Sequence, residues 1–397
     1  MGRVPPEQRR RVALLIVVGV LGAFGPFGTD MYLPALPQLG AELGATDAET
    51  QLTMVGYLLG LGVGQLVWGP LSDRIGRRTP ILIGTIGFTV VSIACALAPS
   101  VWVLIPIRLV QGLLGAAGVV VGRAVVRDLY SGADLARIFS RLTIVFGLAP
   151  IVAPVVGGAL LTFTDWRGTF VVLTGLGAAL TVATLVWVPE TLDPAHRIHG
   201  RSTARGEAWR ALARSPQFVR YTIVAVVAMT GLFAYITSVS LVLQQEWRLD
   251  PTAFSLWFAV NAVGGILGGQ AGGWLVRRFP ARTMLPVTML VSVLAAGLVA
   301  AAAVLRGPFW LLELGLFLGM AGFMMGSPLS MALTLEPFQR GAGTAAAVLG
   351  AAQFTVGSIS PVLVAALAGT TTLSMGVTMA VAAVAALVIA ALPRARR

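Results

Sequence analysis

Long apolar segments alternate with short polar links along the whole chain. Each segment has about 20 or more mostly apolar residues, the length that an α-helix needs to cross a bilayer. The links between the segments are polar and mostly short. The pattern predicts twelve membrane-spanning helices, at residues 12–34, 50–71, 79–98, 101–124, 138–161, 168–188, 218–243, 252–275, 283–304, 309–335, 342–368 and 372–392.

The composition agrees with an integral membrane protein. Of the 397 residues, 57% are hydrophobic and 11% are charged, which leaves too little polar surface for a soluble globule of this size. The formal net charge is +12. The basic residues are all arginine, they fall mainly in the links, and no basic stripe is interleaved with aromatic residues. We therefore expect a lipid bilayer as partner and no nucleic acid.

The arginines also predict the direction of each span, because positive residues gather on the cytoplasmic side of membrane proteins. They cluster before the first span, in the second, fourth and eighth links, and in the C-terminal tail. The first link is acidic, and the third, fifth, seventh and ninth links contain at most one arginine each. We expect a multi-pass protein of the bacterial inner membrane with both termini in the cytoplasm.

A polar stretch near the middle divides the chain. Residues 189–216 contain five arginines and both histidines, His196 and His199, and are interpreted as a cytoplasmic linker between six-helix halves at 1–188 and 217–397. Two histidines without a carboxylate or cysteine partner are more typical of a surface than of a metal site or pH sensor. We predict no metal site and no catalytic residue.

The second link carries the most specific motif. It resembles motif A of the major facilitator superfamily, Gly-x-Leu-x-Asp-Arg-x-Gly-Arg-Arg. The resemblance implies that these residues gate transport at the cytoplasmic ends of two spans, through ion pairs with the other half and with a helix end. A positive-inside anchor is the alternative for the arginines, but it does not explain Asp73. The motif positions are Gly69, Asp73, Arg74, Gly76, Arg77 and Arg78.

A second copy of this motif supports the two halves. Residues 268–283 align with 64–79 at a shift of 204 residues, with Arg277 in place of Asp73. The second copy therefore lacks the acid that accepts a salt bridge in the motif.

The resemblance covers essentially the whole chain. It implies an all-α integral membrane protein with the major facilitator fold, in which twelve transmembrane helices form two pseudo-symmetric six-helix halves around a midplane cavity. It also implies a monomer that needs no cofactor and uses the proton gradient as its energy source.

The end of the first span resembles one particular subgroup of this superfamily. The segment that begins at Asp30, Asp-Met-Tyr-Leu-Pro-Ala-Leu-Pro, is similar to one in the Bcr/CflA group, which includes bicyclomycin, chloramphenicol and florfenicol exporters. An acid inside an apolar span is costly unless it faces a cavity or a partner, so we predict that Asp30 couples proton or substrate movement. The alternatives are a solvated interfacial acid or a local cap before Pro34. Some relatives have a further acid where this chain has Gly22, which leaves proton stoichiometry open.

The fourth span supplies the predicted partner of Asp30. Arg108 and Gln111 begin a sequence that resembles motif B, whose arginine the family assigns to proton transfer; its inner end has Arg123, Arg127 and Asp128. At 1.5 Å per residue, Asp30 lies roughly 6 Å and Arg108 roughly 10 Å below the outer surface, so the two could pair. A switch and a permanent structural pair both remain open.

The fifth span resembles motif C, which is found chiefly in exporters of the antiporter kind. Proline removes a backbone donor and paired glycines permit close helix packing, which suits a bendable gate helix. The motif positions are Gly147, Pro150, Pro154, Gly157 and Gly158.

The predicted cavity residues are polar or aromatic positions within spans. Glu313 could line the cavity, or it could be a carboxylate at the membrane interface, since Trp310 lies beside it. The cavity candidates are Tyr32, Tyr57, Phe146, Phe233, Tyr235, Asn261, Glu313, Met320 and Gln353.

The sequence contains no nucleophile elbow, zinc-protease helix, phosphate-binding loop or histidine within a span, so we do not expect an enzyme. We expect proton-coupled efflux of a small drug or antibiotic by alternating access. The expected substrate resembles a phenicol or bicyclomycin, and a neutral drug is favoured. The alternative is a transporter or passive facilitator of an endogenous metabolite in the same superfamily.

Overall fold

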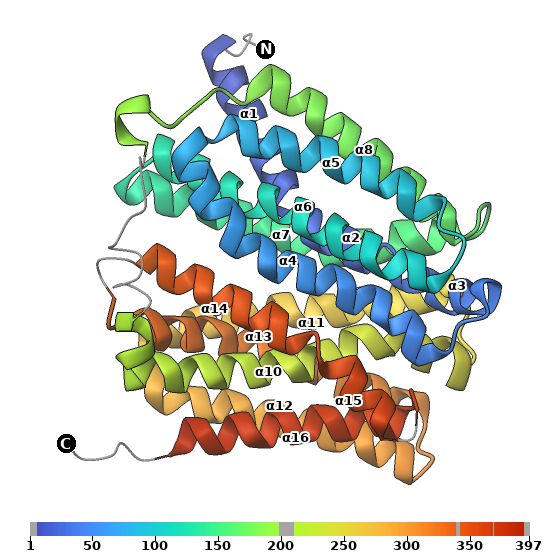
Figure 1. Cartoon of the computed structure of the whole chain (residues 1–397). Coiled ribbons are helices and arrows are strands. Elements are labelled where there is room, and N and C mark those ends of the chain that lie inside the picture. Colours follow the sequence, from blue (N-terminus) through green and yellow to red (C-terminus); the bar gives the residue numbers. More distant parts are fainter. Residues whose placement is uncertain (1–5, 198–209, 339–341, 368, 393–397) are drawn as a thin grey trace, which may run out of the picture. The chain divides into compact units, whose positions relative to one another are not determined.

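The computed structural model describes residues 6–197, 210–338, 342–367 and 369–392, which are almost entirely helical and include no strand (Figure 1). The N-terminal helices are α1 (Pro6–Gly22), α2 (Phe24–Asp30), η1 (Leu33–Ala35), α3 (Leu36–Leu43), α4 (Asp47–Ile75), α5 (Arg78–Ala96), α6 (Val101–Leu129), α7 (Gly132–Leu160), α8 (Trp166–Trp187) and η2 (Pro194–His196). The C-terminal helices are α10 (Pro216–Leu241), η3 (Val242–Glu246), α11 (Pro251–Arg278), α12 (Ala281–Val304), α13 (Phe309–Leu335), α14 (Ala342–Gly357), α15 (Ser360–Ala366) and α16 (Thr372–Ala391).

The helices fall on the predicted spans. Among the described residues, ten helices are long and apolar enough to cross a membrane, and a bent pair at the N-terminus makes an eleventh. The remaining predicted span lies on α7, whose described apolar part, Val145–Leu160, is shorter than the others. The chain is therefore a multi-pass membrane protein.

Two predicted spans are broken where a straight helix was expected. The first span bends by 41° between Val12–Gly22 and Phe24–Leu43, and the span predicted at 342–368 divides into α14 and α15. In both places a proline stands four residues after the last residue of the first helix: Pro26 follows Gly22, and Pro361 follows Gly357. Proline cannot donate the hydrogen bond to that carbonyl, and its ring crowds the preceding turn.

The contacts divide the chain into two units. The first contains residues 1–38 and 56–201, and the second contains residues 39–55 and 202–397. The change after residue 201 falls within the stretch predicted as a linker; residues 198–209, including His199, lie outside the described part. Residues 39–55 group with the second unit, where Gln51 donates to Oγ1 of Thr370 at 2.8 Å and Gln245 donates to Asp47 at 3.2 Å.

Each unit contains a pair of parallel helices packed through glycines. In the first unit a Cβ on Gly64 of α4 would lie 2.8 Å from the carbonyl oxygen of Leu113 on α6. In the second unit a Cβ on Gly268 of α11 would lie 2.1 Å from the carbonyl oxygen of Ala321 on α13. Gly64 and Gly268 are equivalent positions of the two motif copies, so the repeated helix packs closely on the helix after next in both units.

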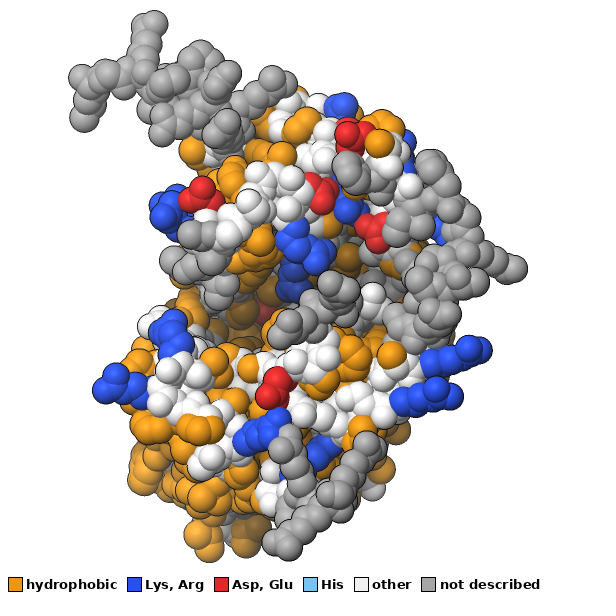
Figure 2. Space-filling model, turned by 90° about the vertical axis from the view of Figure 1, so that its left-hand side faces the viewer, with side chains coloured by type: hydrophobic (Ala, Val, Ile, Leu, Met, Phe, Trp, Pro, Cys, Tyr) orange, Lys and Arg blue, Asp and Glu red, His pale blue; other side chains and the backbone are white. Residues whose placement is uncertain are grey.

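The surface matches the predicted membrane environment. Arginine side chains stand out on the face in Figure 2, which looks at the helix ends on the left-hand side of Figure 1. Large apolar side chains along the helices are exposed, including Trp102 (62%), Val171 (61%), Leu294 (62%) and Val381 (64%). Exposed apolar residues in this number are costly in water and are satisfied by lipid chains.

Candidate functional site

Arg108 is the centre of the polar site in the first unit. Its side chain is 0% exposed. One guanidinium nitrogen donates to the carbonyl oxygen of Gly28 on α2 at 2.8 Å, and another donates to Oε1 of Gln111 at 2.6 Å. These bonds tie α6 to the last turn of α2, the turn that ends at Asp30.

Aromatic rings surround the same guanidinium. The Cζ atom of Arg108 lies 4.3 Å from the ring centre of Tyr57, 4.8 Å from that of Tyr32 and 5.5 Å from that of Phe170. The Tyr57 hydroxyl donates to the carbonyl oxygen of Phe24 at 2.9 Å, which fixes its ring over the cation. Ring faces stabilise a desolvated cation, so Tyr32 and Tyr57, two predicted cavity residues, form the wall around Arg108.

Asp30 lies buried at the end of α2, with 6% of its surface exposed. Its Oδ1 accepts a hydrogen bond from the Thr29 hydroxyl at 2.8 Å. The predicted ion pair with Arg108 is not among the ion pairs of the described residues; Arg108 instead holds the Gly28 carbonyl, two residues earlier. The two side chains therefore occupy the same buried region, and two neutral oxygens, of Gly28 and Gln111, accept hydrogen bonds from Arg108.

A hydrogen-bond chain extends from Arg108 to α5. Gln111 accepts from Arg108 and donates from Nε2 to the Ser92 hydroxyl at 2.7 Å. Ser92 donates in turn to the carbonyl oxygen of Phe88 at 2.7 Å, and the Cys95 thiol lies 3.7 Å from Oε1 of Gln111. This chain fixes the amide orientation of Gln111 so that its oxygen faces the cation.

The predicted motif C helix, α7, packs against the Asp30 segment. A Cβ on Gly157 would lie 2.1 Å from the carbonyl oxygen of Met31, so only glycine permits this approach. Phe146 lies against Gly22 of α1, where an added Cβ would be 2.1 Å from its ring. The motif glycine thus contacts the backbone next to Asp30, and Phe146 occupies the place that a side chain at position 22 would need. Gly147, Pro150, Pro154 and Gly158 lie on the same helix.

Motif A forms a compact ion-pair cluster within the first unit. Arg77 is mostly buried and pairs with Oδ1 of Asp73 at 2.7 Å and with Oδ2 of Asp128 on α6 at 2.8 Å. It also donates to the Ser72 hydroxyl at 2.9 Å. Gly76 has φ = +98°, a conformation that disfavours other residues. The cluster therefore joins the α4–α5 hairpin to the end of α6, which is where the predicted motif B residue Asp128 lies.

Glu190 completes this cluster and is not among the predicted site residues. Its carboxylate accepts from the backbone N–H of Arg77 at 2.8 Å and of Arg78 at 3.3 Å, at the start of α5. Arg78 in turn donates to the carbonyl oxygen of Leu185 at 2.8 Å. Although burial, the largest single effect, acts in the opposite direction, the N–H groups of Arg77, Leu192, Arg78 and Thr191 lower the pKa of Glu190. Glu190 directly follows the sixth predicted span, which could have indicated a role at the helix ends. The sequence pattern instead places it in the predicted linker.

The second unit also has an ion pair between its copy of the hairpin and the following helix. Arg282 at the start of α12 pairs with Glu336 at the end of α13 at 2.8 Å and also donates to Gln217 at 3.2 Å. The second copy lacks the motif acid, as its sequence shows, and the acid that pairs with its arginine comes from another helix. The predicted gating residue Arg74 is exposed at the end of α4. Arg123 and Arg127, the predicted inner end of motif B, are exposed near the end of α6.

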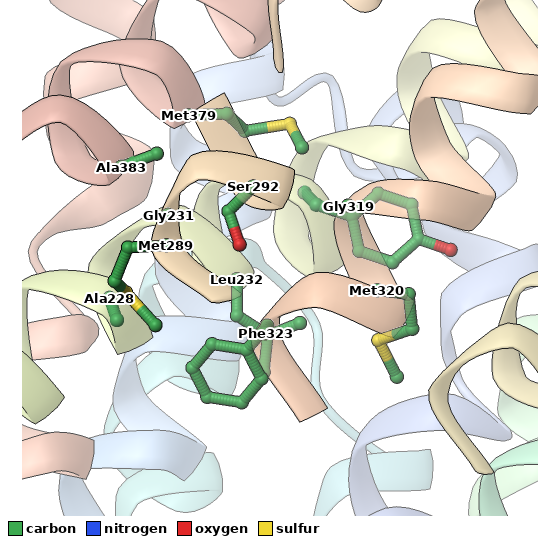
Figure 3. A pocket seen from close by; sticks show the side chains of 11 residues that line it. Ala228, Gly231, Leu232, Met289, Ser292, Gly319, Met320, Phe323, Met379 and Ala383 are labelled. Atoms are coloured by element: carbon green, nitrogen blue, oxygen red, sulfur yellow. The ribbon is translucent and has the colours of Figure 1, made fainter. Parts of the chain in front are cut away.

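The other cavity candidates belong to the second unit. Tyr235 stacks on Phe258 at 5.8 Å, and Phe233 lies 5.6 Å from Phe354, next to the half-buried Gln353. Asn261 and Glu313 are buried on α11 and α13. Tyr235 and Met320 line a pocket between α10, α12, α13 and α16, which is apolar apart from the hydroxyls of Tyr235 and Ser292 (Figure 3).

Comparisons with known proteins agree on one family. A family model described as Major Facilitator Superfamily matches residues 18–361. The chain is 31% identical over 373 residues to a "bicyclomycin resistance protein homolog" of Haemophilus influenzae, covering 94% of both chains. It is 29% identical over 350 residues to a "chloramphenicol resistance protein" of Pseudomonas aeruginosa, covering 85% of this chain and 80% of that one.

The fold is also that of a solved transporter. A crystal structure of a mutant of the nucleoside transporter NupG matches with a TM-score of 0.77 at 13% identity, covering 96% of this chain and 98% of that one. At this identity the likeness shows the fold alone.

Proposed function

Because the chain belongs to the major facilitator superfamily, and is a transporter and not an enzyme, we propose that it exports a small drug from the bacterial cytoplasm in exchange for protons. The observation that carries the proposal is the burial of Asp30 beside the turn that Arg108 holds. It acts as a monomer in the inner membrane with both termini in the cytoplasm.

Asp30 is the proton-accepting group in this proposal. An ionised carboxylate in an apolar span is costly, and a proton removes that cost. Arg108 donates to neutral oxygens of Gly28 and Gln111, so these two hydrogen bonds remain when Asp30 is protonated. Proton binding at Asp30 therefore changes the charge of the site without leaving an unpaired buried cation, which is what a reversible switch requires.

The proposed substrate is a neutral antibiotic such as a phenicol or bicyclomycin. The names of the similar proteins support this class. The first span contributes one acid, and Phe146 fills the space at Gly22 where some relatives have another. A single carboxylate that must release its proton in each cycle leaves no permanent anion in this span to attract a cationic drug.

The test is drug susceptibility of an efflux-deficient host that expresses the protein, across phenicols, bicyclomycin, fluoroquinolones and cationic dyes, with and without a protonophore. We expect protection against the neutral compounds that the protonophore abolishes. Protection against no compound would favour a metabolite transporter, and protonophore-resistant protection would contradict proton coupling.

The Asp30→Asn variant tests the coupling residue in the same host. It should remain in the membrane at normal levels and give no more protection than empty vector, because the amide cannot bind and release a proton. The matched control is Asp134→Asn, which removes an exposed acid that pairs with Arg137 on the same unit and should leave protection unchanged. Full protection by Asp30→Asn would contradict the proposed role of Asp30 as the proton-accepting group.

A further inference from the structure

A second buried acid belongs to the second unit. Glu313 on α13 is 5% exposed, and neither carboxylate oxygen has a hydrogen-bond partner. Asn261 on α11 is 0% exposed, and both polar atoms of its amide are also without partners. Buried polar groups in proteins are nearly always hydrogen-bonded, so two such side chains together require an explanation.

The glycine packing of α11 on α13 places the two side chains next to each other. Gly264, Gly268 and Gly272 approach the backbone of Phe317, Ala321 and Met325 in that order. The contacts advance by four residues on both helices, so the helices are parallel and in constant register. One further step of four residues brings Glu313 against the turn of α11 that contains Asn261.

No described cation neutralises Glu313. The helices packed on α13 are α10, α11, α12 and α14. Their arginines are Arg220, Arg277, Arg278 and Arg282, all near the other end of these helices. The charged residues in the segments that adjoin this end of the helices, Glu246, Arg248, Asp250 and Arg306, are exposed. Tyr235 is the titratable residue of α10 on this side, and its ring lies on Phe258, one turn before Asn261.

The Glu313 carboxyl and the Asn261 amide are suited to binding a proton. An unpaired carboxylate in this environment carries a desolvation cost, and protonation removes its charge. The Asn261 amide can donate to the ionised carboxylate through its nitrogen and accept from the protonated acid through its oxygen. The pair can therefore satisfy Glu313 in both protonation states by rotation of one amide.

We propose that Glu313 and Asn261 form a second proton-binding site, one that is loaded and unloaded during the transport cycle. The site itself is inferred from the packing of α11 on α13, whereas its role in coupling proton movement to drug export rests on the proposed function. Exchange would then move two protons for each neutral drug molecule, one through Asp30 in the first unit and one through Glu313 in the second.

Carbodiimide labelling tests the site without any transport. Dicyclohexylcarbodiimide reacts with protonated carboxyls in apolar surroundings and leaves a stable N-acylurea that mass spectrometry locates. The full-length Asp30→Asn variant in detergent should be labelled at Glu313, and labelling should fall as pH rises. Glu336 on the same helix is exposed and paired with Arg282, so it is the internal control and should stay unlabelled. Absence of label at Glu313 across pH 5 to 9 would overturn the site.

Proton-to-drug stoichiometry in proteoliposomes tests the coupling. The Glu313→Gln variant should exchange one proton per drug molecule, half the wild-type ratio, and Glu313→Asp should keep the wild-type ratio, which also shows that the variant position tolerates substitution. An unchanged ratio in folded Glu313→Gln overturns the coupling. A selective loss of cationic substrates with an unchanged ratio overturns it too, because it identifies an anchor for an amine. Failure of the wild type to transport any drug rejects the proposed function and leaves the labelling test of the site intact.

Discussion

At the scale of single residues, the Arg108 guanidinium organises the first unit. It bonds two neutral oxygens, on α2 and on its own helix, and is enclosed by three aromatic rings. This arrangement uses the planar fork of arginine, which directs several donors at once and stacks on rings. The position is therefore specific for arginine and not only for positive charge.

The Arg108→Lys variant should accordingly lose most of its activity although the charge is kept. Lysine is a compact cation that cannot bond Gly28 and Gln111 together in this geometry, so we expect drug efflux to fall by about tenfold or more. Initial efflux rates in proteoliposomes, compared at equal amounts of folded protein, check this. An efflux rate within twofold of wild type would show that charge alone is needed.

Glu190 predicts a pH dependence of stability. Its folded pKa lies below the ordinary value of 4.5 because backbone N–H groups at the start of α5 bond the carboxylate, in spite of partial burial. The carboxylate thus stabilises the fold above pH 4.5, and this contribution is lost as pH falls through the lower folded pKa. Since the side chain is exposed, the contribution is less than about 1 kcal/mol.

Thermal unfolding of wild type and Glu190→Gln between pH 3 and 7 tests this dependence. The wild type should be slightly more stable at pH 6 to 7, and the difference should shrink toward zero as the solution is acidified below 4.5. A difference that is constant with pH would mean that the carboxylate charge plays no part.

At the scale of elements, close helix packing depends on a few glycines. Gly112 on α6 lies against the backbone of Tyr57 on α4, where an added Cβ would be 2.0 Å from the carbonyl oxygen. A backbone atom cannot move aside as a side chain does, so the two helices would have to separate. The separation would also shift the Tyr57 ring that faces Arg108.

The Gly112→Ala variant should therefore be destabilised, by about 1–3 kcal/mol for an overpacked contact. Gly175→Ala on α8 is the matched control, because nothing lies within 4 Å of the position that its Cβ would take. Apparent melting temperatures of the two variants in the same detergent check the prediction. Equal melting temperatures would contradict the packing that the structure shows.

At the scale of the whole chain, each unit has a similar cluster built with different residues. Arg77 pairs with Asp128 in the first unit, and Arg282 pairs with Glu336 in the second. In both units an arginine of the repeated hairpin meets an acid at the end of the helix that follows the hairpin. Both units therefore have an ion pair between these helices, although the second copy has Arg277 at the position of the motif acid Asp73.

Membrane topology can be tested with single cysteines, because Cys95 is the sole cysteine in the sequence and is buried. Ser131 lies between α6 and α7, in a predicted cytoplasmic link, and Thr164 lies between α7 and α8, in a predicted external link. In right-side-out vesicles a membrane-impermeant maleimide should label Thr164→Cys and not Ser131→Cys. The reverse labelling would overturn the predicted orientation.

The sequence by itself determined the span pattern, the family and the residue types at the sites, because membrane insertion is a local property of about 20 residues and motif A is contiguous. It also located Asp30, Arg108 and Asp73. It did not reveal the bends at Pro26 and Pro361, since proline in a span is often accommodated without a break. Only the tertiary structure showed which groups lie together: Arg108 bonds Gly28, Glu190 bonds the start of α5, and Glu313 lies on the helix packed against that of Asn261. Each of these placements joins segments that lie far apart in sequence, and the register of α4 on α6 and of α11 on α13 depends on glycine packing between backbones, which no local pattern specifies.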